Sequence, residues 1–289
     1  MSLTILNGLS EVVERYELFI CDVWGVLHDG LRPYPGVRDC LHRLRERGRK
    51  VALLSNAPRP GDNVAVQLAG IGLEADCYDT LLTSGDATRE ALLRRDEPWC
   101  AGLGRRLYHL GPERCLPTVK GLGEAVPLAR ADVIVCTGLF DDESETPEQY
   151  HGLLAPAAAR GVPLICANPD RVVMRGERMI PCAGAVADLY AGLGGPVHRY
   201  GKPYANVFAA VLEHAGVSDR AHAVMIGDGF LTDIAGAANA GLDSIWVAGG
   251  IHAEEVGFAD GVPLDAGRIA AVAAAAGERP TAAIGRLVW

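Results

Sequence analysis

The sequence predicts an α/β fold, a doubly wound parallel sheet into which a second α/β domain is inserted. Short apolar runs alternate along the chain with turns and with segments of helical periodicity, as expected for parallel βα units. The 289 residues are enough for two domains of ordinary size. The middle of the chain repeats the βα pattern on its own, and the last part continues the pattern of the first. We therefore expect residues 1–96 and 199–289 to form a core domain, and residues 97–198 to form the inserted domain.

The first series of elements begins with an apolar run, residues 18–21, which ends at Asp22. Residues 36–47 carry apolar side chains three to four positions apart with charges between them, which predicts an amphipathic helix that ends at Gly48. The next apolar run, residues 50–54, predicts the following strand. Helices near 62–70 and 85–95 and a strand at 80–83 complete this series.

The later elements are predicted from the same two signals. Short apolar runs predict strands, and longer segments bounded by turn residues predict helices. In the middle region we expect strands at 106–110, 133–136 and 164–166, and helices near 147–160 and 183–192. In the last region we expect short extended segments at 197–200, 223–226 and 244–247, and helices near 204–215 and 232–240.

The composition excludes several classes of protein. Hydrophobic residues make up 49% of the chain and charged residues 22%, close to the averages for soluble globular proteins, which excludes a disordered or fibrous protein. The chain has 27 lysines and arginines against 36 aspartates and glutamates, a formal net charge of −9. This acidic balance argues against nucleic acid as a partner.

Cysteine usage and the absence of long apolar segments predict a cytoplasmic protein. The eight cysteines include no Cys-x-x-Cys pair and no paired histidine spacing, so the spacing predicts no zinc site. Cys136 and Cys166 lie inside apolar runs and are expected to be small core residues of a protein in a reducing compartment. The start of the chain has early acids and no basic segment before an apolar one, so we expect no signal peptide. No apolar stretch approaches the roughly 18 residues that span a bilayer, so we expect no membrane partner.

Polar side chains follow the predicted strands at several points where the chain turns. In open parallel sheets ligands bind at the carboxyl ends of the strands, so we expect these side chains to gather at one crevice. Several carboxylates in one crevice repel one another and must be protonated, paired or bound to a metal. All-oxygen donors favour Mg²⁺, which proteins hold by one or two carboxylates together with substrate phosphate oxygens. The side chains concerned are Asp22, Ser55, Asn56, Lys202, Asp228 and Asp233.

A phosphoryl group is the ligand that this set of side chains suits. The hydroxyl of Ser55, the amide of Asn56 and the cation of Lys202 are the groups needed to bind and neutralise phosphoryl oxygens. Asp22 is then a candidate nucleophile that forms an aspartyl-phosphate. The residues therefore predict phosphoryl transfer.

Four short motifs in this order resemble those of the haloacid dehalogenase superfamily. The long insertion between the second and third motifs is similar to that of the branch that includes the NagD-type nucleotide and sugar phosphatases. The resemblance spans about residues 16 to 250 and implies a Rossmannoid core with an inserted α/β cap, and a Mg²⁺-dependent phosphohydrolase acting on a small phosphorylated metabolite. The motifs are Asp22-Val-Trp-Gly-Val-Leu27, Leu54-Ser55-Asn56, Gly201-Lys202-Pro203 and Gly227-Asp228-Gly-Phe-Leu-Thr-Asp233, and the insertion contains Ala167-Asn168-Pro169-Asp170.

The resemblance also implies a role for each acidic motif residue. Asp22 would be the nucleophile and a Mg²⁺ ligand, and the backbone carbonyl of Trp24 would contact the same ion. Asp228 would be a further metal ligand. Asp233 would hold the surroundings of the ion or the ammonium group of Lys202.

The remaining motif residues would contact the substrate. By the same resemblance, Ser55 and Asn56 would bind phosphoryl oxygens, and Lys202 would neutralise charge on the nucleophile and the phosphate. The inserted domain would be a cap that closes over the substrate and excludes water, with Asn168 and Asp170 on its substrate-facing loop. Cap domains often pair, so a homodimer is an expectation.

Trp24 departs from the family pattern. Most phosphatases that resemble this chain carry Asp two residues after the nucleophile, where it protonates the leaving oxygen and later deprotonates the attacking water. General acid–base help is worth about 10²–10⁴ in rate, and its loss matters most for leaving groups of high pKa. The enzyme could act on acyl or aryl phosphates, or His28 or Asp29 could supply the proton. The dehalogenases also have an aromatic residue at this position, but a metal-free dehalogenase does not need the acid at Asp228.

Two other classes of function stay open at this point. A protein that has lost its proton shuttle could bind phosphorylated ligands with little turnover and act as a regulator. A phosphotransferase would result if an alcohol competed with slow water attack on the aspartyl-phosphate.

Overall fold

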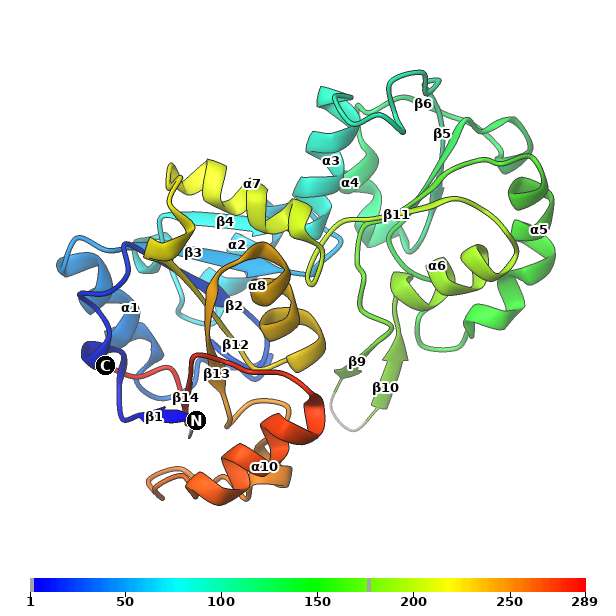
Figure 1. Ribbon diagram of the computed structural model, residues 1–289. Coiled ribbons are helices and arrows are strands. Elements are labelled where there is room, and N and C mark those ends of the chain that lie inside the picture. The colour runs from blue at the N-terminus through cyan, green and yellow to red at the C-terminus, as the bar shows by residue number, and fades with distance from the viewer. Residues whose placement is uncertain (1–2, 176–177) are drawn as a thin grey trace. The chain divides into compact units, whose positions relative to one another are not determined.

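The computed structural model describes residues 3–175 and 178–289, which form two compact units (Figure 1). We name them the core unit and the inserted unit. Each unit contains several strands and its own buried side chains. The core unit consists of Met1–Ser55, Ala65–Leu82 and Lys202–Trp289, and the inserted unit consists of Asn56–Val64 and Thr83–Gly201.

The inserted unit begins earlier in the chain than the predicted inserted domain. It includes residues 56–64 and 83–96, which the sequence analysis assigned to the core. Helix α3 (Ser84–Arg94) is attached to this unit by Arg89, whose guanidinium donates to the backbone carbonyls of Thr118 and of two neighbouring residues. The expectation that residues 97–198 act as the functional cap stays a prediction.

The core unit is built on a seven-stranded sheet with the order β1-β14-β13-β12-β2-β3-β4. The strand pairings from β1 through to β3 are all parallel, which agrees with the predicted α/β class. Strands β2 and β12 are buried along their whole length, as expected for central strands covered on both faces. The strands are β1 (Thr4–Leu6), β2 (Leu18–Asp22), β3 (Lys50–Ser55), β4 (Thr80–Thr83), β12 (Ala223–Gly227), β13 (Asp243–Val247) and β14 (Ala282–Ile284).

The helices of the core unit occupy the segments between these strands. Helices α1 and α7 both contact β3, and α7 also packs against α8. Several short 3₁₀ or π-helical turns link the longer elements. The helices are α1 (Val37–Glu46), α2 (Gly61–Gly70, which begins in the inserted unit), α7 (Ala205–Ala215), α8 (Ala235–Ala240), α9 (Ala253–Val256) and α10 (Ala266–Ala276), and the turns are η1 (Leu9–Glu11), η2 (Ala75–Cys77), η6 (Arg220–His222) and η7 (Phe230–Ile234).

The two ends of the chain complete one edge of the core sheet, which the sequence analysis did not predict. Strand β1 pairs with β14 near the other terminus (Figure 1). Helix α10 contributes Ile269 and Ala273 to a buried cluster around Trp246, whose indole lies 4.5 Å from the ring of Phe230 between centroids. These elements are short or rich in alanine, so their apolar periodicity is weak.

The inserted unit has a five-stranded parallel sheet with the order β11-β8-β7-β5-β6 and a separate antiparallel hairpin, β9-β10. Helix α3 begins with a capping box in which Thr83 and Asp86 satisfy each other's backbone N–H groups. The strands are β5 (Arg106–Leu110), β6 (Glu124–Ala125), β7 (Val133–Cys136), β8 (Leu164–Cys166), β9 (Val172–Arg175), β10 (Arg178–Pro181) and β11 (Val197–Arg199), and the further helices are η3 (Glu113–Cys115), α4 (Leu116–Val119), η4 (Leu128–Arg130), η5 (Pro147–Tyr150), α5 (His151–Ala159) and α6 (Ala183–Gly192).

The cysteines behave as small core residues. All eight lie within the described residues, and all are buried free thiols, as the sequence analysis expected. Among the helices of the described residues, none combines the length and the apolar character needed to cross a membrane.

The packing of α7 against α8 leads to a prediction about stability. A Cβ added to Gly236 of α8 would lie 2.5 Å from the ring of Phe208, so the two helices are in tight contact there. Phe208→Ala removes a fully buried ring from this contact and is expected to lower the free energy of unfolding by about 3–5 kcal/mol. Urea-induced unfolding measures the change. Val66→Ala is the control, because Val66 is 75% exposed, and equal midpoints for both variants would contradict this packing.

Candidate active site

The register of three neighbouring strands brings the predicted site residues to one edge of the core sheet. Asp22 at the end of β2 lies opposite Leu54 of β3, so Ser55 is the next residue along that edge. Cys21 lies opposite Ile226 of β12, and β12 ends at Gly227, so Asp228 comes directly after β12 at the same edge of the sheet. Because these strands are parallel, their carboxyl ends meet, as the sequence analysis predicted.

A buried ion pair network joins three of these residues. The Nζ atom of Lys202 lies 2.5 Å from Oδ1 of Asp22 and 2.7 Å from Oδ1 of Asp233. Lys202 is only 2% exposed. Burial alone would lower the pKa of Lys202, but the charges of Asp22 and Asp233 outweigh burial and raise this pKa above its ordinary value. Lys202 is therefore a permanent positive charge at this site.

Asp228 joins the other two aspartates in a compact acidic cluster. One carboxylate oxygen from each of Asp22, Asp228 and Asp233 lies within 4.8 Å of the others. Burial, and then the charge of Asp233, raises the pKa of Asp228 to about 7. The same two causes raise the pKa of Asp22 well above its ordinary value, although Lys202 opposes them. One ammonium group cannot balance three ionised carboxylates, so the cluster either keeps protons or binds further positive charge.

The backbone around the cluster is shaped to fit these carboxylates. The N–H of Ile251 donates to Oδ2 of Asp228 at 2.8 Å. A Cβ on Gly25, which has a φ of +80°, would lie 2.1 Å from the same oxygen, and a Cβ on Gly250 would lie 2.2 Å from it. Only glycine leaves room for Asp228 at these two positions. The sequence analysis missed Gly250 and Ile251, although a glycine pair one residue after a predicted strand is a signal of close approach.

Asp233 is placed differently from the other two aspartates. It lies in the π-helical turn η7, and its Oδ2 accepts from the N–H of Gly229 at 2.9 Å while its Oδ1 faces Lys202. Both of its oxygens are thus engaged by the protein. The ion pair with Lys202 is compatible with one of the two roles that the resemblance implied, and that role stays a prediction.

The residues present fit a divalent cation. The donors are hard carboxylate oxygens, the set that Mg²⁺ prefers. Asp22 and Asp228 would hold the ion, since Asp233 is occupied. The predicted contact to the backbone carbonyl of Trp24 stays a prediction.

The side chain of Trp24 lies at the surface beside this site. It is 49% exposed, and its ring meets that of His28 edge-on at 5.8 Å between centroids. His28 is buried, and its Nδ1 accepts from the N–H of Gly30 at 2.8 Å. Burial lowers the pKa of His28 even though the charge of Asp29 opposes this.

Neither neighbour of Trp24 has the properties of a general acid near neutral pH. The backbone N–H groups of Arg32 and Leu31 bind Asp29 and lower the pKa of its carboxyl group, so Asp29 is ionised. His28 is neutral for the reason given above. A neutral imidazole and an ionised carboxylate are poor proton donors to a leaving oxygen.

The other predicted site residues gather in the inserted unit. The Nδ2 of Asn56 donates to Oδ1 of Asp170 at 2.8 Å, and the N–H of Asp170 donates to Oδ1 of Asn168 at 3.1 Å. The hydroxyl of Ser84 donates to Oδ1 of Asn56 at 3.3 Å. The predicted phosphate-binding amide and the predicted substrate-facing loop are therefore hydrogen-bonded to each other. Ser84 is a member of this group that the sequence analysis did not identify.

The raised pKa of Asp228 predicts how the metal-free protein responds to pH. The folded protein keeps a proton on Asp228 up to about pH 7, whereas an unfolded aspartate loses it near pH 4. The folded state therefore binds more protons in this interval, and the free energy of unfolding falls as the pH rises from about 4 to 7. Thermal unfolding in EDTA across this range measures the slope. Asp228→Asn is expected to flatten it, and an equal slope in the variant would contradict the assignment.

Comparisons with known proteins identify the family of this chain. A family model described as haloacid dehalogenase-like hydrolase matches residues 19–124, and a second, described as HAD-hydrolase-like, matches residues 199–265. The chain is 29% identical over 239 residues to the ribonucleotide monophosphatase NagD of Escherichia coli K12, covering 80% of this chain and 87% of NagD. It is 27% identical over 252 residues to the D-glycerol 3-phosphate phosphatase of Mycobacterium tuberculosis, covering 84% of this chain and 66% of the relative.

A solved structure extends the similarity to the whole chain. The crystal structure of a haloacid dehalogenase-like family hydrolase from Brucella suis has 39% sequence identity and a TM-score of 0.79, and the match covers 98% of this chain and all of that one. NagD of Escherichia coli also matches in structure, with a TM-score of 0.69, 25% identity, and coverage of 94% of this chain and 97% of NagD. The motifs and the inserted α/β unit thus lead to one assignment, and the chain belongs to the haloacid dehalogenase-like hydrolases, in their NagD-like branch.

Proposed function

We propose that the protein is a Mg²⁺-dependent phosphohydrolase that acts on a small phosphorylated metabolite through an aspartyl-phosphate at Asp22. The observation that carries the proposal is the buried group of Asp22, Lys202, Asp228 and Asp233 at the carboxyl edge of the core sheet. The names of both curated relatives support it, because each is a phosphatase of a phosphorylated small molecule.

The first step of the proposed reaction is attack by Asp22 on phosphorus. The carboxylate is held by two donors to its Oδ1, the ammonium group of Lys202 and the N–H of Val23 at 2.7 Å. A bond forms between a carboxylate oxygen and phosphorus, and the bond from phosphorus to the ester oxygen breaks. A divalent cation, when bound, supplies positive charge beside the phosphoryl oxygens. Lys202 adds a permanent positive charge there.

The second step is hydrolysis of the aspartyl-phosphate. Water attacks phosphorus, inorganic phosphate leaves, and the Asp22 carboxylate is regenerated. Ser55 and Asn56 are proposed to bind the phosphoryl oxygens, and the inserted unit is proposed to be a cap that contributes Asn168 and Asp170. The family resemblance supports these roles.

The leaving group must depart without a proton from the residue at position 24. Trp24 has no acidic proton to give. The lowered pKa values of His28 and Asp29 make both poor proton donors near neutral pH. We therefore propose substrates with good leaving groups, such as acyl or aryl phosphates. The same feature favours the second candidate function, a protein that binds phosphorylated ligands and turns them over slowly.

Asp22→Asn is expected to abolish metal-dependent phosphate release, because an amide is not a nucleophile toward phosphorus. Steady-state release from p-nitrophenyl phosphate and acetyl phosphate is measured with Mg²⁺ and with EDTA. Asp39→Asn, which changes an exposed carboxylate on α1, is the matched control. Equal rates in Asp22→Asn and the wild type would contradict the proposal, whereas ligand binding without turnover in the wild type would favour the second candidate.

Trp24→Asp is expected to raise kcat for an alkyl sugar phosphate by about 10²–10⁴-fold, the usual contribution of a general acid. The gain for p-nitrophenyl phosphate is expected to be much smaller, because that leaving group needs no proton. Trp24→Phe removes the indole without adding an acid and is the control. An equal gain for both substrates, or a gain in Trp24→Phe, would show that the indole limits access instead.

A further inference from the structure

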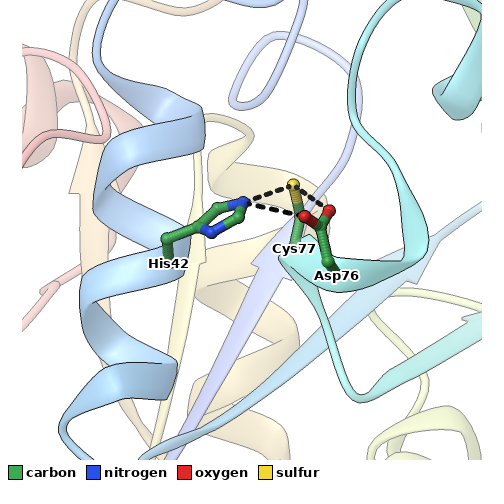
Figure 2. A group of neighbouring side chains, drawn as sticks. All are labelled: His42, Asp76 and Cys77. Atoms are coloured by element: carbon green, nitrogen blue, oxygen red, sulfur yellow. Dashed lines mark hydrogen bonds and ion pairs between the residues drawn. The ribbon is translucent and has the colours of Figure 1, made fainter.

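A second group of metal-ligating side chains lies in the core unit, away from the residues of the proposed active site. His42 of α1 points toward Asp76 and Cys77 of the short helix η2 (Figure 2). The Nε2 atom of His42 lies 3.5 Å from Sγ of Cys77 and 3.6 Å from Oδ2 of Asp76. The Sγ of Cys77 lies 3.6 Å from Oδ1 of Asp76.

One donor atom from each of the three residues lies within 4.8 Å of the others, and the closest pairs are 3.5–3.6 Å apart. The two close contacts of Asp76 use different oxygens of its carboxylate, so this exposed carboxylate must turn to present one oxygen to an ion. With zinc at about 2.0–2.3 Å from nitrogen, oxygen and sulfur ligands, the ligands of a tetrahedron lie about 3.3–3.6 Å apart. One thiol, one imidazole and one carboxylate are also a donor set that suits zinc and its neighbours, unlike the all-oxygen set of the acidic cluster. We propose that His42, Asp76 and Cys77 form a binding site for a zinc-class divalent metal ion, with a fourth position open to solvent.

The surroundings allow an ion to enter and the donors to release their protons. Cys77 is buried, whereas the side chains of His42 and Asp76 are 34% and 51% exposed, so the site opens outward. Binding converts the thiol of Cys77 to a thiolate, and the proton passes to solvent. Burial, and then Asp76, raises the pKa of this thiol to about 11, so metal binding must displace a proton.

One nearby cation opposes metal binding and can move away. Arg38 lies one turn before His42 on α1, and its Nη2 is 3.8 Å from Oδ2 of Asp76. Its side chain is half exposed, so it can turn to solvent when an ion takes its place. Arg45 on the same helix donates to the backbone carbonyl of Asp76 and to the carboxylate of Asp79, and so holds η2 against α1.

The same residues do not form a nucleophilic triad. In a triad the histidine uses one ring nitrogen for the nucleophile and the other for the carboxylate. Here Nε2 of His42 faces both the sulfur of Cys77 and the carboxylate of Asp76. The raised pKa also keeps the sulfur a thiol, which is a weak nucleophile. Convergence on one nitrogen is the geometry expected when an ion binds between the three groups.

Cobalt is the probe that tests the site, because only a thiolate ligand gives a sulfur-to-cobalt charge-transfer band. The reduced, chelator-treated full-length protein is titrated with Co²⁺ and followed by near-ultraviolet and visible absorption. We expect a charge-transfer band with strong visible bands, and loss of both when Zn²⁺ is added, since zinc binds more tightly than cobalt. Cys77→Ser is expected to lose the charge-transfer band, and His42→Gln to weaken cobalt binding.

Two control variants make the result specific. Cys40→Ser changes another buried thiol, on the same helix as His42, and is expected to keep the band. The double variant Asp22→Asn, Asp228→Asn removes the two carboxylates that would hold a metal in the acidic cluster. It is also expected to keep the charge-transfer band, so the outcome is independent of the proposed phosphatase function. In that double variant Zn²⁺ is expected to raise Tm, and adding Cys77→Ser is expected to remove the rise.

The proposal is overturned if wild-type protein shows no charge-transfer band at saturating cobalt. It is also overturned if the band survives in Cys77→Ser or disappears in Cys40→Ser. Because His42 is on the helix surface, His42→Gln is expected to fold, and an unchanged cobalt affinity in that variant would equally rule out the site.

Discussion

The buried ammonium group of Lys202 is the interaction on which the rest of the site depends. Moving a charged group from water into a protein costs several kcal/mol, so it is tolerated only beside close opposite charges. Asp22 and Asp233 provide these charges, and Lys202 in turn keeps two neighbouring carboxylates from repelling each other. Well-packed apolar side chains would stabilise the fold at least as well. The ion pairs are therefore better explained by chemistry than by stability.

The backbone of the core unit is arranged around the three carboxylates. Each aspartate receives a backbone N–H, from Val23 for Asp22, from Ile251 for Asp228 and from Gly229 for Asp233. The loops that supply these donors come so close that a single Cβ at Gly25 or Gly250 would collide with Asp228. Such donors favour the ionised carboxylates, whereas burial and mutual repulsion favour the protonated ones. A bound cation would resolve this conflict in favour of the ionised state.

Local signals in the sequence were sufficient to predict the edge of the core sheet where Asp22 and Asp228 lie. Strand β2 ends at Asp22 and helix α6 spans Ala183–Gly192, as predicted, because apolar runs and turn residues mark both elements. Strand β14 and helix α10 were not predicted, since a three-residue strand and an alanine-rich helix have little apolar contrast. The predicted helix near 232–240 begins instead with the π-helical turn η7, whose buried Asp233 is bound to Gly229.

Contacts between distant segments could not be read from the sequence. Ile251 is 23 residues from the carboxylate that it binds, and Cys77 is 35 residues from His42. The spacing rules for zinc sites apply to ligands that lie close together in the chain, so they could not predict that Cys77 lies beside His42. Only the packing of α1 against η2 brings those donors together.

In the proposed reaction, Trp24 separates two contributions to catalysis that the family resemblance implies are usually combined. The residues proposed to bring positive charge to the phosphoryl group are buried: Lys202 itself, and Asp22 and Asp228, which would hold a divalent cation. The group that would protonate the leaving oxygen is replaced by an exposed indole. Charge neutralisation acts on the phosphoryl oxygens whatever the leaving group is, whereas proton donation matters in proportion to the basicity of the leaving oxygen. Under the proposed mechanism the site would retain the part of catalysis that is common to all phosphate esters, and the pKa of the leaving group would decide which of them it can hydrolyse.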